Sequence, residues 1–428
     1  MKMIKRENKK IVKSALILLS ILLFISTGAS AAVVKIGLNY PKTGPYSVQG
    51  LAQLRAAEMA VDEINQAGGI LGRNVELVVR DSQSKADLAK KNVEDLIDNE
   101  GVEMIFGGSS SAVAIAGGKA AKSRGKLYFG TLTYSNATTG VQGHKYIFRE
   151  CYNAWMGAKV LSEYLKEHFS GKRYFYVTAD YTWGWTTEAS IRKFSRTLDK
   201  KRHKRVLTPF PGATRKNFQE ALTKAAASRA EVLVLVLFGK DMADAVKLAT
   251  EMGLKKKMSI VVPNLTLGMA ASAGPKVMEG VVGALPWSWK VPFTYNYTKG
   301  IAFVEDFGIK YKSYPSTSAA SAYTIMYQYK EAVERAGGFD TKAVIAMLEG
   351  HKYTLLKDEQ VWRAFDHQSI QTVYAVRCKP EAQVLKDKYK QDYFEIIKAM
   401  AGEKAARSKD RWARTRKATG LQLAELQW

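Results

Sequence analysis

The sequence has few of the residues from which catalytic and metal centres are built. Its 428 residues include two cysteines, Cys151 and Cys378, and five histidines. It contains no Cys/His spacing of a metal site, no Gly-x-Ser-x-Gly nucleophile elbow and no Walker-type phosphate loop. We therefore expect a protein that is not an enzyme, with no catalytic residue, metal or cofactor, and rank a secreted hydrolase last among the possible functions.

Long hydrophobic runs are also scarce, because the chain has one near its start and no second of membrane length. Ala15–Ser26 is apolar, follows a head rich in Lys and Arg, and precedes the small residues Gly28–Ala31. This order is typical of a secretory signal peptide. We predict that residues 1–31 are cleaved and that the protein is exported to the periplasm. An uncleaved anchor is the alternative, but the run is shorter than the ~20 residues that span a bilayer.

Cysteine usage leaves one question open. Export to an oxidising compartment would allow a disulfide between Cys151 and Cys378. Two separate buried thiols fit the sequence equally well. No cysteine lies near the predicted cleavage site, so we do not expect a lipid anchor.

Acidic residues are too few to balance the basic ones. The chain carries 65 Lys and Arg against 40 Asp and Glu, a formal net charge of +25. Such a field attracts anions, but export and the lack of a recognisable motif argue against nucleic acid as a partner. Part of the excess lies in residues 401–428, which we predict to be a solvated or poorly ordered basic tail. A surface facing anionic lipid is the alternative for this tail.

Short apolar runs alternate with amphipathic stretches in two successive series. Val33–Leu38 is typical of a strand and Leu51–Ile64 of a helix, and the apolar run Val232–Leu237 is typical of a strand covered on both faces. Regular βα alternation predicts parallel sheets with right-handed crossovers. The fold class we predict is α/β, with two doubly wound parallel-sheet lobes.

The chain after the signal peptide is too long for a single core of typical size. We predict a first lobe of residues 33–149 and 284–336, and a second lobe of residues 150–283 and 337–400. A chain that returns to a lobe late in the sequence crosses between lobes several times, and several crossings make a hinge. A ligand cleft between the lobes is expected.

The sequence resembles the type I periplasmic binding proteins of the branched-chain amino acid/amide class. The resemblance covers about Val33–Ile397 and depends on the order of several short landmarks rather than on one motif. These landmarks are Pro41–Pro45, Glu58–Gly72, Gly107–Ser111, Tyr146–Arg149, Asp180–Gly184, Glu251–Leu254 and Asp366–Gln368. The resemblance implies a two-lobed receptor that closes on a small organic solute.

On the first lobe, Ser109, Ser110 and Ser111 follow a Gly-Gly pair and open a predicted helix, whose free N–H groups suit an anion. The resemblance implies that these serines hold a ligand carboxylate or amide, whereas a plain N-cap is the alternative. Similarity to the family also places Leu132, Thr133 and Tyr134 in a second ligand loop, for which a capped turn is the alternative. Gln49 is a further candidate.

On the second lobe, the resemblance implies that Tyr181 and Trp183 form an aromatic wall, with a surface aromatic cluster as the alternative. Phe238 and Asp241 follow a buried strand and are expected to face the cleft. Asn264 stands where amino-acid-binding family members carry an acidic residue. Burying a ligand ammonium without a partner costs several kcal/mol, which places a plain α-amino acid in doubt unless Asp241 substitutes.

Taken with the predicted signal peptide, the resemblance implies a substrate-binding protein of an ABC importer, which works by hinge closure. Its expected partners are a small-molecule ligand and a permease in the inner membrane, and we expect a monomer. A soluble ligand-sensing partner of a membrane sensor is the alternative function.

Overall fold

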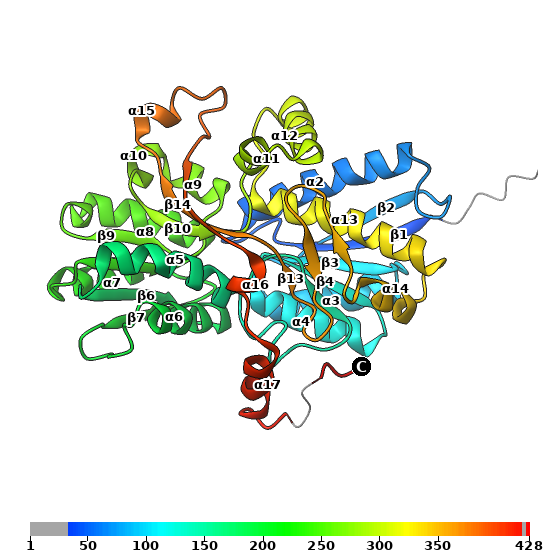
Figure 1. Ribbon diagram of the computed structural model, residues 1–428, viewed down its shortest axis with the longest axis horizontal. Coiled ribbons are helices and arrows are strands. Elements are labelled where there is room, and N and C mark those ends of the chain that lie inside the picture. The colour runs from blue at the N-terminus through cyan, green and yellow to red at the C-terminus, as the bar shows by residue number, and fades with distance from the viewer. Residues whose placement is uncertain (1–32, 422–424) are drawn as a thin grey trace, which may run out of the picture.

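The computed structural model describes residues 33–421 and 425–428, and the predicted signal peptide lies outside this part of the chain. Two β-sheets, each covered by helices, lie side by side in the molecule (Figure 1). The predicted α/β class with two parallel-sheet lobes is confirmed. No described helix has both the length and the apolar character that crossing a membrane requires.

The first lobe is built on a five-stranded parallel sheet of order β2-β1-β3-β4-β5. Its strands are β1 (Val34–Tyr40), β2 (Val75–Asp81), β3 (Met104–Gly108), β4 (Leu127–Thr131) and β5 (Ile147–Arg149). Helices α2 (Ser47–Gln66) and α13 (Thr317–Ala336) pack together on one face, and α3 (Ala86–Asp98) and α4 (Ser111–Ser123) pack together on the other.

The second lobe contains a seven-stranded sheet of order β15-β14-β10-β9-β8-β6-β7. Its parallel strands are β6 (Tyr174–Ala179), β7 (Arg205–Thr208), β8 (Val232–Val236), β9 (Ser259–Val262) and β10 (Val282–Leu285), and the antiparallel pair is β14 (Val373–Cys378) and β15 (Phe394–Met400). Every residue of β8 is buried, as its unbroken apolar sequence requires.

Helices cover both faces of this second sheet. Helices α5 (Ala154–Phe169) and α6 (Thr182–Phe194) pack against each other, α7 (Arg215–Ala227) packs against α8 (Gly239–Glu251), and α8 also contacts α9 (Leu267–Ala273). The short elements η1 (Leu254–Lys256) and α10 (Pro275–Met278) pack against α8.

The chain passes between the two sheets three times before residue 400. It crosses after β5, then through α11 (Lys290–Tyr295) and α12 (Thr298–Tyr311) on its way to α13, and finally between β13 and β14. The small antiparallel sheet that precedes the last crossing consists of β11 (Lys352–Tyr353), β12 (Gln360–Trp362) and β13 (Ser369–Ile370). The predicted hinge would lie at these crossings.

Residues 337–370 lie beside the first lobe, although we predicted them in the second. Helix α14 (Thr341–Leu348) packs against α13. The imidazole of His367 stacks on Phe148 of β5, with ring centroids 3.8 Å apart, and the backbone N–H of Arg149 donates to the carbonyl of His367. These contacts fix the segment on the first lobe, and the return to the second lobe begins only at β14.

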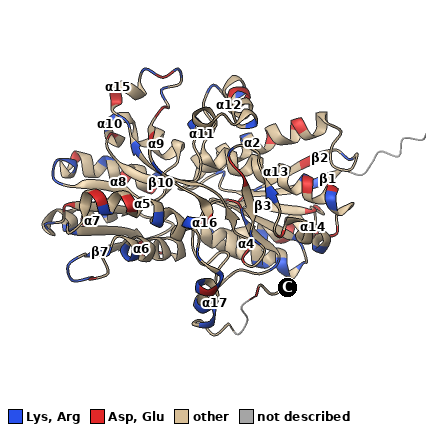
Figure 2. Cartoon of the chain, viewed as in Figure 1, with Lys and Arg blue, Asp and Glu red and all other residues tan. Residues whose placement is uncertain are grey.

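The C-terminal residues also differ from the expected solvated tail. After the short helices α15 (Glu381–Val384) and α16 (Gly402–Ala405), the chain forms α17 (Lys409–Lys417). Trp412 is fully buried and its indole N–H donates to the carbonyl of Thr139 at 2.8 Å. The basic residues of α17 appear in blue in Figure 2, and an apolar anchor among these charges accounts for the ordered helix.

The two cysteines do not pair. Cys151 and Cys378 are free, and both are buried. Burial raises the pKa of both thiols, which keeps them protonated. The alternative of two separate buried thiols is therefore what the structure contains.

Candidate functional site

The predicted serine run lies where β3 ends and α4 begins, at the border between the lobes. Ser109 adopts a left-handed φ of 57°, and Ser110 precedes the first residue of α4 in an extended conformation. The Oγ of Ser109 accepts from Nε2 of Gln53 at 2.6 Å, and the Oγ of Ser111 accepts from the N–H of Ser135 at 3.0 Å. Ser110 is fully buried, and its hydroxyl has no hydrogen-bond partner in the described chain.

The second predicted loop follows the neighbouring strand β4, so the parallel sheet brings it beside the serines. Leu132 has a left-handed φ of 49°, and the side chain of Thr133 packs over Gly108 and Gly130, where no Cβ would fit. The Oγ1 of Thr133 is buried and has no partner among the described residues.

Arg149, in one of the sequence landmarks, holds this second loop in place. Its buried guanidinium donates to the carbonyl of Thr133 at 2.9 Å, to Oγ1 of Thr139 at 2.6 Å and to Oε1 of Gln368 at 2.8 Å. Burial lowers the pKa of Arg149 to about 10. Its carbonyl and amide partners satisfy the buried charge, so the loop is positioned rigidly.

Aromatic rings from both lobes meet next to these loops. Trp183 lies 5.9 Å from Phe238, and Tyr134 lies 5.8 Å from the same ring, measured between centroids. Tyr46 from the first lobe stacks on Phe210, with ring centroids 5.1 Å apart, and Tyr181 also stacks on Phe210, at 4.1 Å. The interlobe aromatic cluster consists of Tyr46, Tyr134, Tyr152, Tyr181, Trp183, Phe210 and Phe238.

Hydrogen bonds join the lobes around this cluster. Nε2 of Gln49 on α2 donates to Oγ1 of Thr266, which caps α9, at 3.2 Å. The backbone N–H of Lys240 donates to the carbonyl of Pro45 at 2.9 Å. Gly239 has a φ of 61° and lies so close to Pro45 that no Cβ would fit, which explains glycine at the start of α8.

Asn264, where an acidic residue would favour an amine, is 1% exposed. Its Nδ2 donates to the hydroxyl of Tyr152 at 2.7 Å, and that hydroxyl donates to the carbonyl of Ala284 at 3.0 Å. The ring of Tyr152 stacks on Tyr134, with centroids 5.0 Å apart. Asn264 is thereby tied to the aromatic cluster through Tyr152.

Asp241 supplies an acidic group beside the cluster. It lies in the first turn of α8 and is 8% exposed. Burial, with a smaller contribution from Asp244, raises the pKa of the Asp241 carboxyl to about 7. Asp241 also acts electrostatically on the hydroxyls of Tyr46 and Tyr181. A carboxyl in this state is poised to ionise when a cation approaches.

Unsatisfied polar atoms gather at this interlobe region. Buried polar atoms in folded proteins almost always have a hydrogen-bond partner, so each exception requires an explanation. The atoms without a partner in the described chain include Gln49 Oε1, Ser110 Oγ, Thr133 Oγ1, Tyr134 OH, Trp183 Nε1 and Asn264 Oδ1. They come from both lobes and include donors and acceptors, which is the arrangement a polar small molecule requires.

Two features used by many enzymes are not seen among the described residues of the site. No histidine hydrogen-bonds to Ser109, Ser110 or Ser111; His367, for example, bonds to Glu349 at 2.7 Å on the first lobe. The described residues contain no group of His, Cys, Asp and Glu side chains that could hold a metal ion. The donors, acceptors and rings present can hold and enclose a ligand.

The structure brings the candidate residues of both lobes to one region, and it adds residues that sequence reasoning missed. Tyr152 and Phe210 contribute rings, and Gln53 orients Ser109. Tyr152 comes three residues after the landmark ending at Arg149, which is the signal that points to it. Phe210 lies outside every landmark, and nothing in the sequence around it indicates this role.

Comparison with known proteins finds a matching family and several relatives. The model of the periplasmic binding protein family matches residues 33–383. Leu/Ile/Val-binding protein homolog 4 of Brucella melitensis is 24% identical over 363 residues, which cover 80% of this chain and 83% of that protein.

Solved structures share the fold over nearly the whole described chain. A periplasmic binding protein of Burkholderia mallei has a TM-score of 0.79 and 26% identity, and the match covers 90% of this chain and 98% of that one. A branched-chain amino acid ABC transporter periplasmic ligand-binding protein of Burkholderia xenovorans has a TM-score of 0.73 and 25% identity, with 88% and 98% covered.

Proposed function

Because the chain belongs to the periplasmic binding protein family, we propose that it is the substrate-binding protein of an ABC importer. In this proposal it is exported by residues 1–31, works as a monomer in the periplasm, and captures a small organic solute between its lobes. The closed form then presents the solute to an inner-membrane permease. The match over residues 33–383 and the names of the relatives in Brucella and Burkholderia support this assignment.

One observation carries the assignment of the binding site. Five buried polar atoms without a protein partner belong to residues of the aromatic cluster or of the loops beside it, and the sequence already pointed to all five residues: Ser110, Thr133, Tyr134, Trp183 and Asn264. These atoms lost their hydrogen bonds to water when they were buried, and a bound ligand can replace those bonds. Micromolar binding corresponds to about −8 kcal/mol, which a few such bonds and one buried apolar group can supply.

The chemistry of the site favours an amino acid or a related small carboxylate. The N-terminus of α4, with the free hydroxyl of Ser110, suits a carboxylate. The rings of Trp183 and Phe238 suit an apolar side chain. Asn264 offers no charge to an ammonium group, so Asp241 is the group that would pair with one. Relatives are named for leucine, isoleucine and valine, which fit this description.

Closure follows from the ligand's contacts with both lobes. Ser110 and Thr133 belong to the first lobe, whereas Trp183 and Asp241 belong to the second. A ligand that contacts both halves binds the closed form more tightly, and this difference in affinity drives the hinge. The bonds between Tyr46 and Tyr181 and between Lys240 and Pro45 are part of the closed arrangement.

The test is a thermal-shift screen of amino acids, amides and aromatic and short-chain acids, followed by titration of the strongest ligand. Thr133→Val removes a hydroxyl that bonds to nothing in the protein while keeping the shape of the side chain. We expect it to weaken binding about tenfold without lowering stability. Ser162→Ala, which removes an equally buried and unpartnered hydroxyl on α5, is the matched control and keeps full affinity.

A screen in which no solute raises the melting temperature would contradict the proposal. So would equal affinity of Thr133→Val and the parent protein, since the free hydroxyl would then serve no ligand. Co-purification of the mature chain with a permease in the presence of the ligand would test the importer role.

A further inference from the structure

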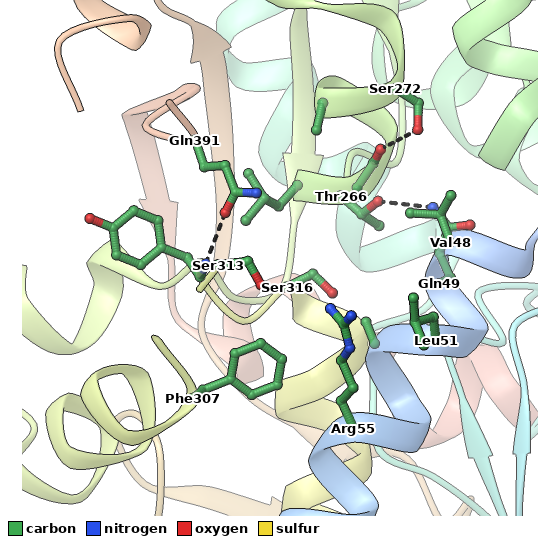
Figure 3. A pocket seen from close by; sticks show the side chains of 15 residues that line it. Val48, Gln49, Leu51, Arg55, Thr266, Ser272, Phe307, Ser313, Ser316 and Gln391 are labelled. Carbon is green, nitrogen blue, oxygen red and sulfur yellow. Dashed lines mark hydrogen bonds between the residues drawn. The ribbon is translucent and has the colours of Figure 1, made fainter. Parts of the chain in front are cut away.

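A hollow that none of the rings of the aromatic cluster lines lies at the lobe border between α2 and α9 (Figure 3). Its volume is about 390 Å³, within the range of small-molecule sites. One wall is the first turns of α2, the opposite wall is α9, and the loop between α12 and α13 closes one end. An occupant of this α2–α9 groove would therefore contact both lobes.

Arg55 is the charged group of the groove. Figure 3 shows its guanidinium extended toward Ser316. Its guanidinium carbon lies 5.0 Å from the ring centroid of Tyr311, whose hydroxyl donates to the backbone carbonyl of Arg55 at 3.0 Å. Among the described residues no carboxylate lies within ion-pair distance of it. A half-buried guanidinium held by an aromatic ring, with no acidic partner, is suited to a planar carboxylate.

Two further features favour an anion beside Arg55. The loop end of the groove is the start of α13, a 20-residue helix whose N-terminal dipole is positive. Ser316 caps it by accepting the N–H of Ser318 at 3.2 Å. Gln49, which is 2% exposed, also lines the groove, and its Oε1 has no partner in the described chain.

The remaining lining is mixed, with apolar side chains beside the neutral polar side chains of Thr266, Ser272, Ser313 and Gln391. Val48 and Leu51 of α2 are 47% and 46% exposed, which is high for such side chains, and Phe307 of α12 and Leu267 of α9 face the same space. The bond from the N–H of Tyr314 to Oε1 of Gln391, at 2.8 Å, fixes the loop that closes the groove. The groove thus combines one cationic group with apolar side chains and several neutral polar groups.

We propose that the α2–α9 groove is a second ligand site, which binds a small monocarboxylate with an apolar body. The carboxylate pairs with Arg55 at the start of α13, and the apolar part lies against Val48, Leu51 and Phe307. The groove shares only Gln49 and Thr266 with the interlobe hydrogen bonds described above and none of the rings of the aromatic cluster. The two sites can therefore be altered independently.

The test uses benzoate as the probe and a reporter placed in the groove. Ser272 is exposed on α9 and lines the groove, so Ser272→Cys can carry an environment-sensitive fluorophore, while the buried Cys151 and Cys378 stay unlabelled. We expect benzoate to change the fluorescence in a saturable manner. Arg55→Gln weakens this response about tenfold, as loss of a charge-assisted bond does. Benzamide, of the same shape without the charge, gives no comparable response.

Two control variants distinguish binding in the groove from binding at the interlobe site and from non-specific attraction of anions by the positive charge of the protein. Thr133→Val, which alters the interlobe site, leaves the benzoate response of the groove unchanged. Arg414→Gln removes an equal charge from the exposed face of α17 and also leaves it unchanged. The proposal fails if Arg55→Gln responds like the parent, if Arg414→Gln weakens binding equally, if benzamide binds as well as benzoate, or if Thr133→Val abolishes the response.

Discussion

The hydroxyls of Tyr46 and Tyr181 lie 2.9 Å apart and join the two lobes of the protein. Phe210 stacks on both rings, at centroid distances of 5.1 and 4.1 Å. The backbone hydrogen bond from the N–H of Lys240 to the carbonyl of Pro45 also joins the two lobes near these tyrosines. The lobes are thus in specific contact, and in the proposed mechanism this contact would belong to the closed form and form without a ligand.

Replacing Tyr181 by Phe removes the interlobe hydroxyl bond and keeps the ring. A hydrogen bond of this kind contributes about 1 kcal/mol, so we expect affinity for the ligand found by screening to fall several-fold, because the closed form loses a contact. Titration calorimetry measures this change. Tyr176→Phe is the control: it removes a 2.6 Å bond to Thr197 inside the second lobe, which should lower stability and leave affinity unchanged. Equal affinities of the two variants would contradict the role of Tyr181.

Asp241 gives the protein a defined pH dependence. Its pKa is about 7 in the folded protein, and about 3.9 is the value of an unfolded chain. Between these values the folded form keeps a proton that the unfolded form has released, so this group's contribution to stability falls as pH rises from about 4 to 7. Asp241→Asn abolishes this contribution. The variant should therefore gain stability relative to the parent over this range, by about 2–4 kcal/mol at pH 8.

Urea unfolding of both proteins at pH 4.5, 6 and 8 checks this expectation. The difference in free energy of unfolding should grow with pH and level off above pH 7. Asp306→Asn, at an exposed position of α12, serves as the control. A constant difference between parent and Asp241→Asn at all three pH values would show that the carboxyl titrates as it does in the unfolded chain.

Much of this architecture could be predicted because it follows from local pattern. The apolar run of β8 requires burial on both faces, and the Gly107–Gly108 pair that ends β3 places the serines at the carboxyl edge of a parallel sheet. Trp183, Phe238 and Asn264 follow other strands or precede helices in the same way. The repeated βα rhythm fixes which ends of the strands meet, and hence which loops lie together between the lobes.

What the sequence could not supply are contacts between distant segments. The stacking of His367 on Phe148, more than two hundred residues away, assigns residues 337–370 to the first lobe, and periodicity carries no trace of it. The charge of residues 401–428 suggested a solvated tail. A single tryptophan in a basic segment does not predict burial, and the packing of Trp412 is visible only from its hydrogen bond to the distant carbonyl of Thr139. The ring of Phe210 between Tyr46 and Tyr181 is a similar case.

The two buried thiols should be unreactive in the native protein. Cys151 and Cys378 are 0% and 1% exposed, and burial raises the pKa of both, so neither thiolate nor access is available to a reagent. A thiol assay should detect no reactive cysteine in native mature protein and two after denaturation. Dithiothreitol should leave the melting temperature unchanged, whereas a fall on reduction would indicate a disulfide.

His144 should make the first lobe sensitive to acid. Burial lowers its pKa to about 3, with repulsion by Lys122 as a smaller cause. The unfolded chain takes up this proton below about pH 6.5 and the folded chain does not, so stability is lost as pH falls from 6.5 toward 3. Between pH 7 and pH 5 the free energy of unfolding of His144→Gln should fall by about 2 kcal/mol less than that of the parent. Urea midpoints at the two pH values measure this, and exposed His168→Gln should follow the parent.

The C-terminal segment joins the lobes by a path that is separate from the hinge crossings. Helix α16 packs against α5 of the second lobe, and from there the chain reaches the first lobe. Buried Arg407 donates to the carbonyl of Asn136 at 3.2 Å, Arg416 donates to the carbonyl of Gly143 at 3.2 Å, and Trp412 lies 5.4 Å from Phe365, measured between ring centroids. Asn136 also bonds through Nδ2 to Ser190 of the second lobe, so the segment rests on an interlobe contact.

Trp412→Ala should therefore release this segment and weaken the contact between the lobes. Loss of a fully buried tryptophan side chain costs about 3–5 kcal/mol of stability. Here it should weaken the packing of α17 against the lobes and leave both sheets folded. Trypsin should cut within residues 404–417, which are rich in Lys and Arg, at a low enzyme ratio in the variant while the rest of the chain resists. Trp185→Ala, at a tryptophan that is 49% exposed, is the control and should be cut as slowly as the parent. Equal protection of the C-terminal residues in Trp412→Ala and the parent would mean that the segment is held by its charges and not by its one buried ring.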